Sequence, residues 1–339
     1  MPVRYFKYDK PFKLENGESL PGLTIAYHTY GTLKGNNTVW VCHALTANSD
    51  VADWWPGTVE EGRFLDPRRH FIVCANIIGS HYGSTGPLSI NPTTGEPWYE
   101  TFPFITIRDI VNAHFLLAEH LGITQINTIV GSSIGGFQAL EMVLTKPRMA
   151  KKLVLIATGA RSQPWTIAFN ESQRMAIETD CTYGEKSEDA GKKGMKTARS
   201  IGLLSYRGSS AYNATQQEND NIFKVAGFRA TTYQQYQGEK LARRFNAYSY
   251  YRLSQAFDSH NVGRYRGGLE AALGQIKCPT LVVGISTDII FPITEQLYLF
   301  RHIPHSELHI LNSEFGHDGF LVESDKLNTI LKPFINQNQ

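Results

Sequence analysis

Short, unbroken apolar runs recur along the chain, each with turn-forming residues beside it. They lie at residues 38–45 (TVWVCHAL), 71–78 (FIVCANII), 126–130 and 152–157. Such runs are typical of strands that are buried on both faces of a parallel sheet. The sequence therefore predicts a set of buried parallel strands in the first half of the chain.

Helical periodicity fills the gaps between these runs. In residues 105–121, apolar side chains recur at helical spacing, and Gly122 stands where a helix C-cap is expected. Residues 134–144 form a second predicted helix, directly after the strand at residues 126–130. The alternation of strand and helix predicts a doubly wound α/β sheet.

A hairpin is predicted near the start of the chain. Asn16 and Gly17 stand between β-like segments, and this dipeptide favours a type I′ turn because both residues tolerate positive φ. We therefore predict a hairpin with a type I′ turn.

The second half of the chain has a different texture. Residues 161–264 contain little strand-like sequence, whereas residues 280–285 (TLVVGI) and 307–311 (ELHIL) restore the strand pattern. We predict an α/β core made of residues 1–160 and 265–339. Residues 161–264 are predicted to form a helical lid, inserted over the carboxyl edge of a mostly parallel sheet.

Composition and charge fit an ordinary globular protein. Of 339 residues, 42% are hydrophobic and 19% are charged, which suffices for a large core. The net charge of +2 gives no reason to expect a nucleic-acid or membrane partner. Because the sequence has neither a signal-peptide core nor a long apolar run, we expect a cytoplasmic protein. The four cysteines show no zinc spacing, so we expect no metal and no bound cofactor.

The strand at residues 126–130 runs directly into Gly-Ser-Ser-Ile-Gly, a G-x-S-x-G motif between strand and helix. Such a serine lies on a turn so tight that only glycine fits around it. The helix that follows directs unpaired N–H groups toward developing negative charge. Ser133 is therefore the candidate nucleophile, and Ser132 is expected to be packed.

A serine nucleophile needs a base, and the base needs an acid that orients it. In α/β-hydrolase folds the chain order is serine, acid, histidine. Asp288 and His317 each follow a predicted strand, at the carboxyl edge where catalytic groups collect in open α/β sheets. Glu314 is a rival acid, but it lies on the same loop as His317. We predict that Asp288 is the acid.

The oxyanion hole of this fold takes two backbone N–H groups. One comes from the residue after the nucleophile, here Ile134, and we assign the other to Leu45. His43, in the same loop as Leu45, is interpreted as a residue that shapes the loop. These residues predict a serine hydrolase or acyltransferase.

The chain resembles the homoserine O-acetyltransferase family from end to end. The matching segments are CHALTAN (42–48), GSTGPLSINP (83–92), GSSIGGFQAL (131–140), IAFNESQRMAI (167–177), ARSIGLLSYR (198–207), GISTDIIFP (284–292) and GHDGFL (316–321). The resemblance implies an α/β-hydrolase fold with the triad Ser133, Asp288 and His317. It also implies a ping-pong transfer of an acetyl group from acetyl-CoA, as co-substrate, to the hydroxyl of L-homoserine, in methionine biosynthesis.

The resemblance also assigns the residues that bind the acceptor. Arg199 matches the arginine that holds the homoserine carboxylate, and Asp318 matches the aspartate that holds its ammonium group. Tyr206 falls on a tyrosine of the same pocket. The family commonly has methionine where this chain has Ile134. Because the donor there is a backbone N–H, we expect Ile134 to keep the role.

Several alternatives stay open from the residues alone. A sister transferase would use succinyl-CoA, or L-serine as acceptor, and a plain esterase would use water. A catalytically silent binding protein of this fold tends to lack a triad residue, and all three are present here. The resemblance also implies a homodimer, formed through the aromatic-rich lid, for example by Tyr248, Tyr250 and Tyr251.

Overall fold

The computed structural model describes residues 1–219 and 223–337. Within these residues the main sheet has eight strands, in the order β1-β4-β6-β5-β7-β8-β9-β10. All neighbours from β6 to β10 are parallel, whereas β1 and β4 add an antiparallel edge. The predicted α/β fold with a mostly parallel sheet is thereby confirmed. The strands are β1 (Arg4–Tyr8), β4 (Leu23–Tyr30), β5 (Thr38–Cys42), β6 (Phe71–Ala75), β7 (Ile126–Ser132), β8 (Ala150–Ile156), β9 (Thr280–Ile285) and β10 (Ser306–Leu311).

Both faces of the central strands are buried. On β5, Trp40 packs into one hydrophobic core, while its neighbours Val39 and Val41 pack into the other. The same alternation runs through β6, β8 and β9. A strand that is covered on both sides needs apolar residues at every position, which explains the unbroken apolar runs in the sequence.

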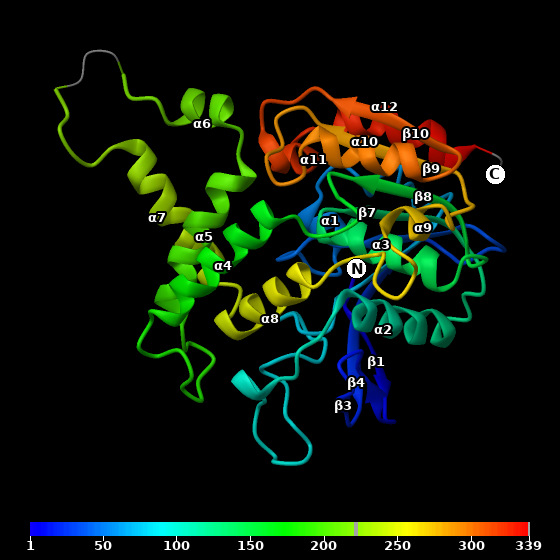
Figure 1. The fold of residues 1–339 in the computed structure, drawn as a ribbon, viewed down its shortest axis with the longest axis horizontal. Coiled ribbons are helices and arrows are strands. Elements are labelled where there is room, and N and C mark those ends of the chain that lie inside the picture. Colours follow the sequence, from blue (N-terminus) through cyan, green and yellow to red (C-terminus); the bar gives the residue numbers. More distant parts are fainter. Residues whose placement is uncertain (220–222, 338–339) are drawn as a thin grey trace.

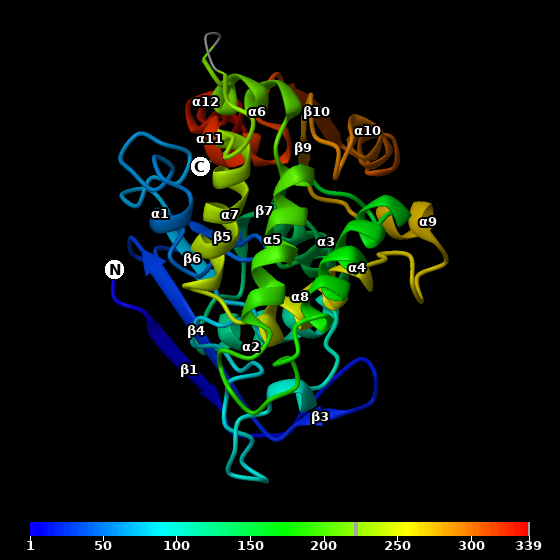
Figure 2. The same cartoon turned by 90° about the vertical axis from the view of Figure 1, so that its left-hand side faces the viewer.

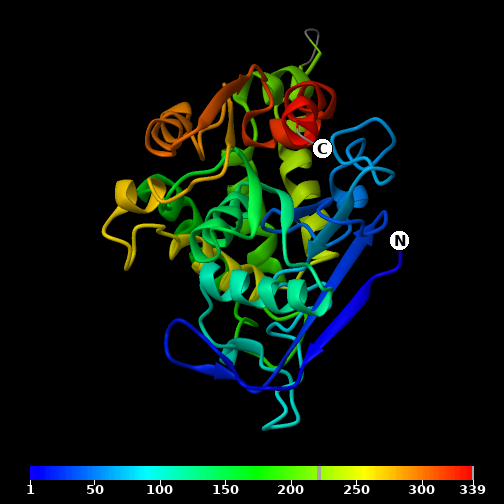
Figure 3. The same cartoon turned by 90° about the vertical axis from the view of Figure 1, so that its right-hand side faces the viewer.

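Helices cover both faces of the sheet. Side chains of α2 and α3 belong to the first core, and those of α1 and α12 border the second. In Figure 3, α12 is the red helix beside the C-terminus. In the described part of the chain, every helix is too short or too polar to cross a bilayer. The bounds of these core elements are α1 (Val51–Trp54), η1 (Tyr99–Thr101), α2 (Ile107–His120), α3 (Ile134–Thr145), α9 (Leu269–Leu273), α10 (Ile293–His302), η2 (Gly316–Asp318), α11 (Gly319–Val322) and α12 (Ser324–Asn336).

Within residues 161–264 the described chain forms five helices, which lie together to one side of the sheet (Figure 1). Figure 2, turned toward that side, shows α5 and α7 in front of the strands. Whether residues 161–264 act as a separate lid domain stays a prediction. The five helices are α4 (Pro164–Glu178), α5 (Lys192–Tyr206), α6 (Ser209–Gln216), α7 (Arg229–Ala242) and α8 (Ala247–Asp258).

The tyrosines chosen as examples of a dimer surface do not fit that role. Tyr248 and Tyr250 are each only 1% exposed. Tyr248 packs against the ring of Tyr183, and the hydroxyl of Tyr250 donates a hydrogen bond to Gln173. The prediction was wrong for these two residues because their rings pack against other residues of the same chain.

The predicted hairpin forms, but with a different turn. β2 (Phe12–Lys13) pairs antiparallel with β3 (Ser19–Leu20). Gly17 has a φ of 93°, whereas Asn16 does not adopt positive φ. The side-chain carbonyl of Asn16 instead accepts the N–H of Glu18 at 2.9 Å. The type I′ prediction was wrong because this local side-chain bond stabilises a longer loop.

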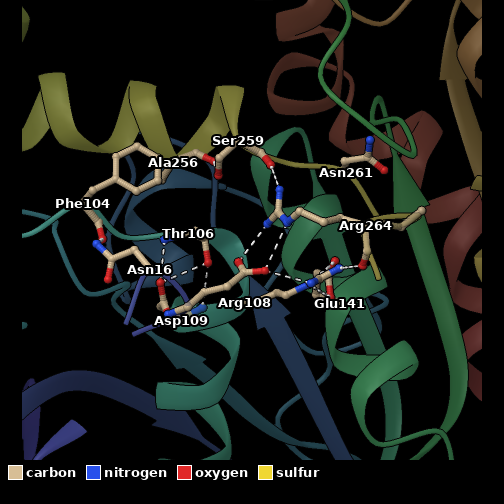
Figure 4. A network of polar contacts seen from close by, with 12 residues as sticks. Asn16, Phe104, Thr106, Arg108, Asp109, Glu141, Ala256, Ser259, Asn261 and Arg264 are labelled. Atoms are coloured by element: carbon tan, nitrogen blue, oxygen red, sulfur yellow. Dashed lines mark hydrogen bonds and ion pairs between the residues drawn. The ribbon is translucent and has the colours of Figure 1, made fainter. Parts of the chain in front are cut away.

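A partly buried ionic network joins the hairpin loop, α2, α3 and the segment after α8 (Figure 4). Glu15 accepts hydrogen bonds from Arg108 and Arg264, each at 2.8 Å. The carboxylate of Glu141 lies 3.3 Å from Arg108 and 2.7 Å from Arg266. Because the Glu141 side chain is 1% exposed, its charge depends on these two arginines.

We expect Glu141→Ala to lower the free energy of unfolding by about 3–5 kcal/mol. The substitution removes the carboxylate that pairs with the mostly buried guanidinium groups of Arg108 and Arg266, and within the described chain only Arg108 keeps a second carboxylate, that of Glu15. Urea unfolding followed by circular dichroism measures the loss. The matched control is Glu61→Ala, since Glu61 and Arg68 pair on the surface with side chains 66% and 61% exposed. That control is expected to lose less than about 1 kcal/mol. Equal losses in the two variants would contradict the prediction.

Candidate active site

Ser133 lies on a strained turn between β7 and α3. Its φ is 55° and its ψ is −127°, a region that residues with a side chain rarely adopt. A side chain at Gly135 would lie 2.1 Å from the carbonyl oxygen of Cys42, and one at Gly131 would lie 2.2 Å from that of Gly135. The glycines of the motif are therefore required by backbone packing around Ser133.

His317 and Asp288 meet beyond the carboxyl ends of β9 and β10. His317 Nδ1 lies 2.7 Å from Asp288 Oδ2, and both residues are buried. The other carboxylate oxygen, Oδ1, accepts the backbone N–H groups of Ile290 and Phe291 at 2.8 and 3.0 Å. Because Nδ1 faces Asp288, Nε2 is the nitrogen that remains for the serine.

The surroundings of His317 favour its charged form. Burial lowers the pKa of the imidazole, but the charge and hydrogen bond of Asp288, together with the charge of Asp318, outweigh it. The net pKa is raised above 6.5. The rival acid Glu314 is exposed, so the geometry favours Asp288 as the partner of the base.

Ser133 and His317 both line one pocket. Among the described residues no hydrogen bond joins the two side chains; such bonds often tighten only when substrate binds. Its lining combines apolar side chains with Arg199, Tyr206 and Asp318. The sequence assigned no role to the remaining lining residues, which are Ala44, Thr46, Thr166, Asn170, Ser205, Phe257, Ile290, Phe320 and Leu321.

The candidate oxyanion donors are free. Among the described residues, neither the N–H of Leu45 nor that of Ile134 donates a hydrogen bond. The loop that carries Leu45 is held by His43: its Nε2 accepts the N–H of Ile77 at 3.1 Å, and its carbonyl accepts Nε2 of Gln138 at 3.2 Å. Burial lowers the pKa of His43 to about 4, so the ring is neutral. Its contacts agree with a role in shaping the loop.

Ile134 replaces the methionine that is common in the family. Its side chain is buried in the core and does not line the pocket. The substitution therefore changes the packing beneath the turn of Ser133, while the backbone N–H keeps its place at the start of α3.

Helix α5 brings two of the predicted binding residues to the pocket. The guanidinium carbon of Arg199 lies 5.2 Å from the centre of the Tyr206 ring, and this guanidinium makes no hydrogen bond or ion pair with any described residue. Asp318, next to His317, has Oδ2 at 3.2 Å from Nε of Arg207. Arg207 stands in the family-like segment ARSIGLLSYR, but nothing in its local sequence indicated this contact.

The fold and the arrangement of serine, histidine and aspartate define the class of protein: it is an α/β-hydrolase-fold enzyme. The family model of the alpha/beta hydrolase fold matches residues 37–324. More closely, the chain belongs to the homoserine O-acetyltransferase family. It is 45% identical over 340 residues to the homoserine O-acetyltransferase of Cyclobacterium marinum, an alignment that covers 100% of this chain and 96% of the relative.

Solved structures agree on the fold. The crystal structure of homoserine O-acetyltransferase from Staphylococcus aureus is 28% identical, with a TM-score of 0.83 and coverage of 100% of this chain and 96% of that one. The crystal structure of esterase E22 reaches a TM-score of 0.88 at 21% identity, covering 99% and 100%. The fold alone therefore does not separate acyl transfer from ester hydrolysis.

We expect acylation of Ser133 by p-nitrophenyl acetate to slow as the pH falls, with its midpoint above pH 6.5. The imidazole of His317 must be neutral to accept the serine proton, and its pKa is raised. Asp318→Asn removes one of the charges that raise this pKa, so the midpoint is expected to move to lower pH. The measurement is kcat/KM as a function of pH.

Glu314→Gln is the matched control for that experiment, because Glu314 is exposed on the same loop. Its midpoint is expected to equal that of the unmodified chain. A midpoint below pH 6.5 in the unmodified chain, or no shift in Asp318→Asn, would count against the assigned electrostatics of the base.

Proposed function

We propose that this chain transfers an acetyl group from acetyl-CoA to the hydroxyl of L-homoserine, in the cytoplasm and as a step of methionine biosynthesis. One observation carries the proposal: the guanidinium of Arg199, which makes no hydrogen bond or ion pair with a described residue, and the carboxylate of Asp318 share a pocket with Ser133 and His317. An α-amino acid presents the complementary carboxylate and ammonium. Membership of the homoserine O-acetyltransferase family supports homoserine as this amino acid and acetyl as the group.

In the first half-reaction, Nε2 of His317 takes the proton of Ser133 while Oγ attacks the thioester carbonyl. The N–H groups of Leu45 and Ile134 stabilise the oxyanion, each by about 3 kcal/mol. The C–S bond then breaks, and the imidazolium gives its proton to the leaving thiolate. The products are free coenzyme A and acetyl-Ser133.

In the second half-reaction, Arg199 binds the homoserine carboxylate in a bidentate manner and Asp318 binds the ammonium group. This places the substrate hydroxyl beside His317. The imidazole takes the hydroxyl proton, the oxygen attacks the acetyl carbonyl, and the bond to Ser133 Oγ breaks. His317 returns the proton to Ser133, so the enzyme is restored.

The apolar part of the pocket supports transfer over hydrolysis. Leu45, Phe257, Ile290 and Phe320 line it close to Ser133. A site lined in this way holds few ordered water molecules, because water needs polar partners. The bound amino acid then supplies the nearest hydroxyl to the acyl group.

The proposal includes a homodimer formed through the inserted helices. Support comes from large apolar side chains that are exposed there, in contrast to the buried Tyr248 and Tyr250. These exposed residues are Leu204, Phe223, Val225, Phe228 and Tyr236.

The first test measures free-thiol release from acetyl-CoA with and without L-homoserine. We expect a burst without acceptor and steady turnover with it, and much lower rates with succinyl-CoA or L-serine. Ser133→Ala is expected to lose activity on the order of a million-fold. Thiol release that is indifferent to every acceptor would make the protein a hydrolase.

We expect Arg199→Met to lower kcat/KM for homoserine roughly 10- to 100-fold, because a charge-assisted pair with the substrate carboxylate is lost. The burst with acetyl-CoA alone is expected to change little. Lys196→Met is the matched control, since Lys196 lies on the same helix and pairs with Glu239. Equal losses in the two variants would remove Arg199 from the acceptor site.

A further inference from the structure

Arg207 touches the acceptor site from outside it. It does not line the pocket of Ser133, but its Nε lies 3.2 Å from Oδ2 of Asp318, which does. On its other side Arg207 borders a separate cavity, together with Ser209 and Tyr212. Arg207 is therefore a cation outside the pocket that contacts Asp318, a carboxylate in the pocket lining.

The position of Arg207 is fixed by the backbone. A side chain at Gly208 would lie 2.0 Å from the carbonyl oxygen of Glu314, and one at Gly316 would lie 2.4 Å from the backbone nitrogen of Gly208. The chain that leaves α5 thus crosses the loop before His317 in direct backbone contact. This crossing holds the backbone next to Arg207 close to the loop that carries Asp318, so that the two side chains can pair.

The charges that face His317 come from several elements. Asp288, after β9, bonds to Nδ1, and Asp318 is the next residue in the chain. Ser133 shares the pocket, and the ring of Tyr206 from α5 lies 6.0 Å from the imidazole between centroids, with Arg199 over its face. Arg207 is the cation that pairs with Asp318, so it offsets one of the two negative charges near the base.

We propose that Arg207 is a positioning residue for the acceptor half-reaction: it holds one oxygen of Asp318 and leaves the other for the substrate ammonium group. The proposal rests on the proposed function. A carboxylate can accept hydrogen bonds on both oxygens. The contact of Arg207 with Oδ2 is an ion pair, in which Nε makes no hydrogen bond with a described residue, and it leaves Oδ1 available. The selection of an amino-acid acceptor then depends on a residue that does not touch the substrate.

The test compares Arg207→Met with Arg207→Lys. In Arg207→Met, Asp318 is free to rotate, and we expect KM for homoserine to rise about 10-fold while acylation by p-nitrophenyl acetate is retained at high pH. The unpaired charge of Asp318 also raises the pKa of His317 further. The pH below which acylation slows, which is the acid limb of its pH profile, therefore moves to a higher value. Arg207→Lys restores a cation and is expected to bring the limb back toward its original position.

A double-mutant comparison isolates the contact. In the Asp318→Asn background, Arg207→Met is expected to leave the acid limb and the homoserine KM unchanged, because the carboxylate that it positions is already gone. Arg243→Met, at the exposed end of α7, is the control and is expected to alter neither quantity.

The outcomes separate this inference from the proposed function. An unmodified chain without homoserine-dependent turnover would remove the proposed function, whatever Arg207 does. Homoserine-dependent turnover with an unchanged KM and acid limb in Arg207→Met would overturn the inference alone. The inference would also be overturned if Arg207→Met lowered the rates of both half-reactions equally and Arg207→Lys restored neither rate. That pattern would mark a purely structural role for Arg207.

Discussion

Ser133 holds its positive φ because both of its peptide groups are fixed by neighbouring elements. Its N–H donates to the carbonyl of Ile156 in β8 at 3.0 Å, and its own carbonyl accepts the hydroxyl of Thr158 at 2.8 Å. Backbone strain of this kind costs about 1–3 kcal/mol and persists only where the surroundings fix it. Here the surroundings are strands buried on both faces, so the sheet stabilises the turn. This turn leaves the N–H of Ile134, at the start of α3, without a described hydrogen-bond acceptor.

The chemistry of the site is divided between two parts of the chain. The sheet supplies Ser133, His317 and Asp288, and its fold is shared with esterase E22. The charged groups suited to an amino-acid acceptor depend on α5, which carries Arg199 and is followed directly by Arg207, the arginine that pairs with Asp318. The close crossing at Gly208 and Gly316 joins these two parts. Under the proposed function, the choice between water and an amino acid would therefore depend on the contact between the insertion and the sheet.

Periodicity predicted much of the fold, because strands buried on both faces leave an unbroken apolar signal. It did not mark where strands end: the apolar run at residues 38–45 continues past β5, since Ala44 and Leu45 line the pocket after the chain has left the sheet. Chain order placed Asp288 and His317 at neighbouring strand ends, and the structure brings them within 2.7 Å, while their catalytic roles stay predictions. Arg207 gave no such signal, because its contact with Asp318 joins distant segments and follows no local pattern.

Two carboxylates flank the same imidazole, and their surroundings differ in a way that suits two tasks. Asp288 accepts hydrogen bonds from the imidazole and two backbone N–H groups, and its side chain is 0% exposed. It has no freedom to bind anything but the base. Asp318 is held by one arginine, and its side chain is 14% exposed toward the pocket. Since a carboxylate with spare acceptor capacity can bind a cation without releasing its partner, these surroundings fit the proposed roles, in which Asp318 binds the substrate and Asp288 orients His317.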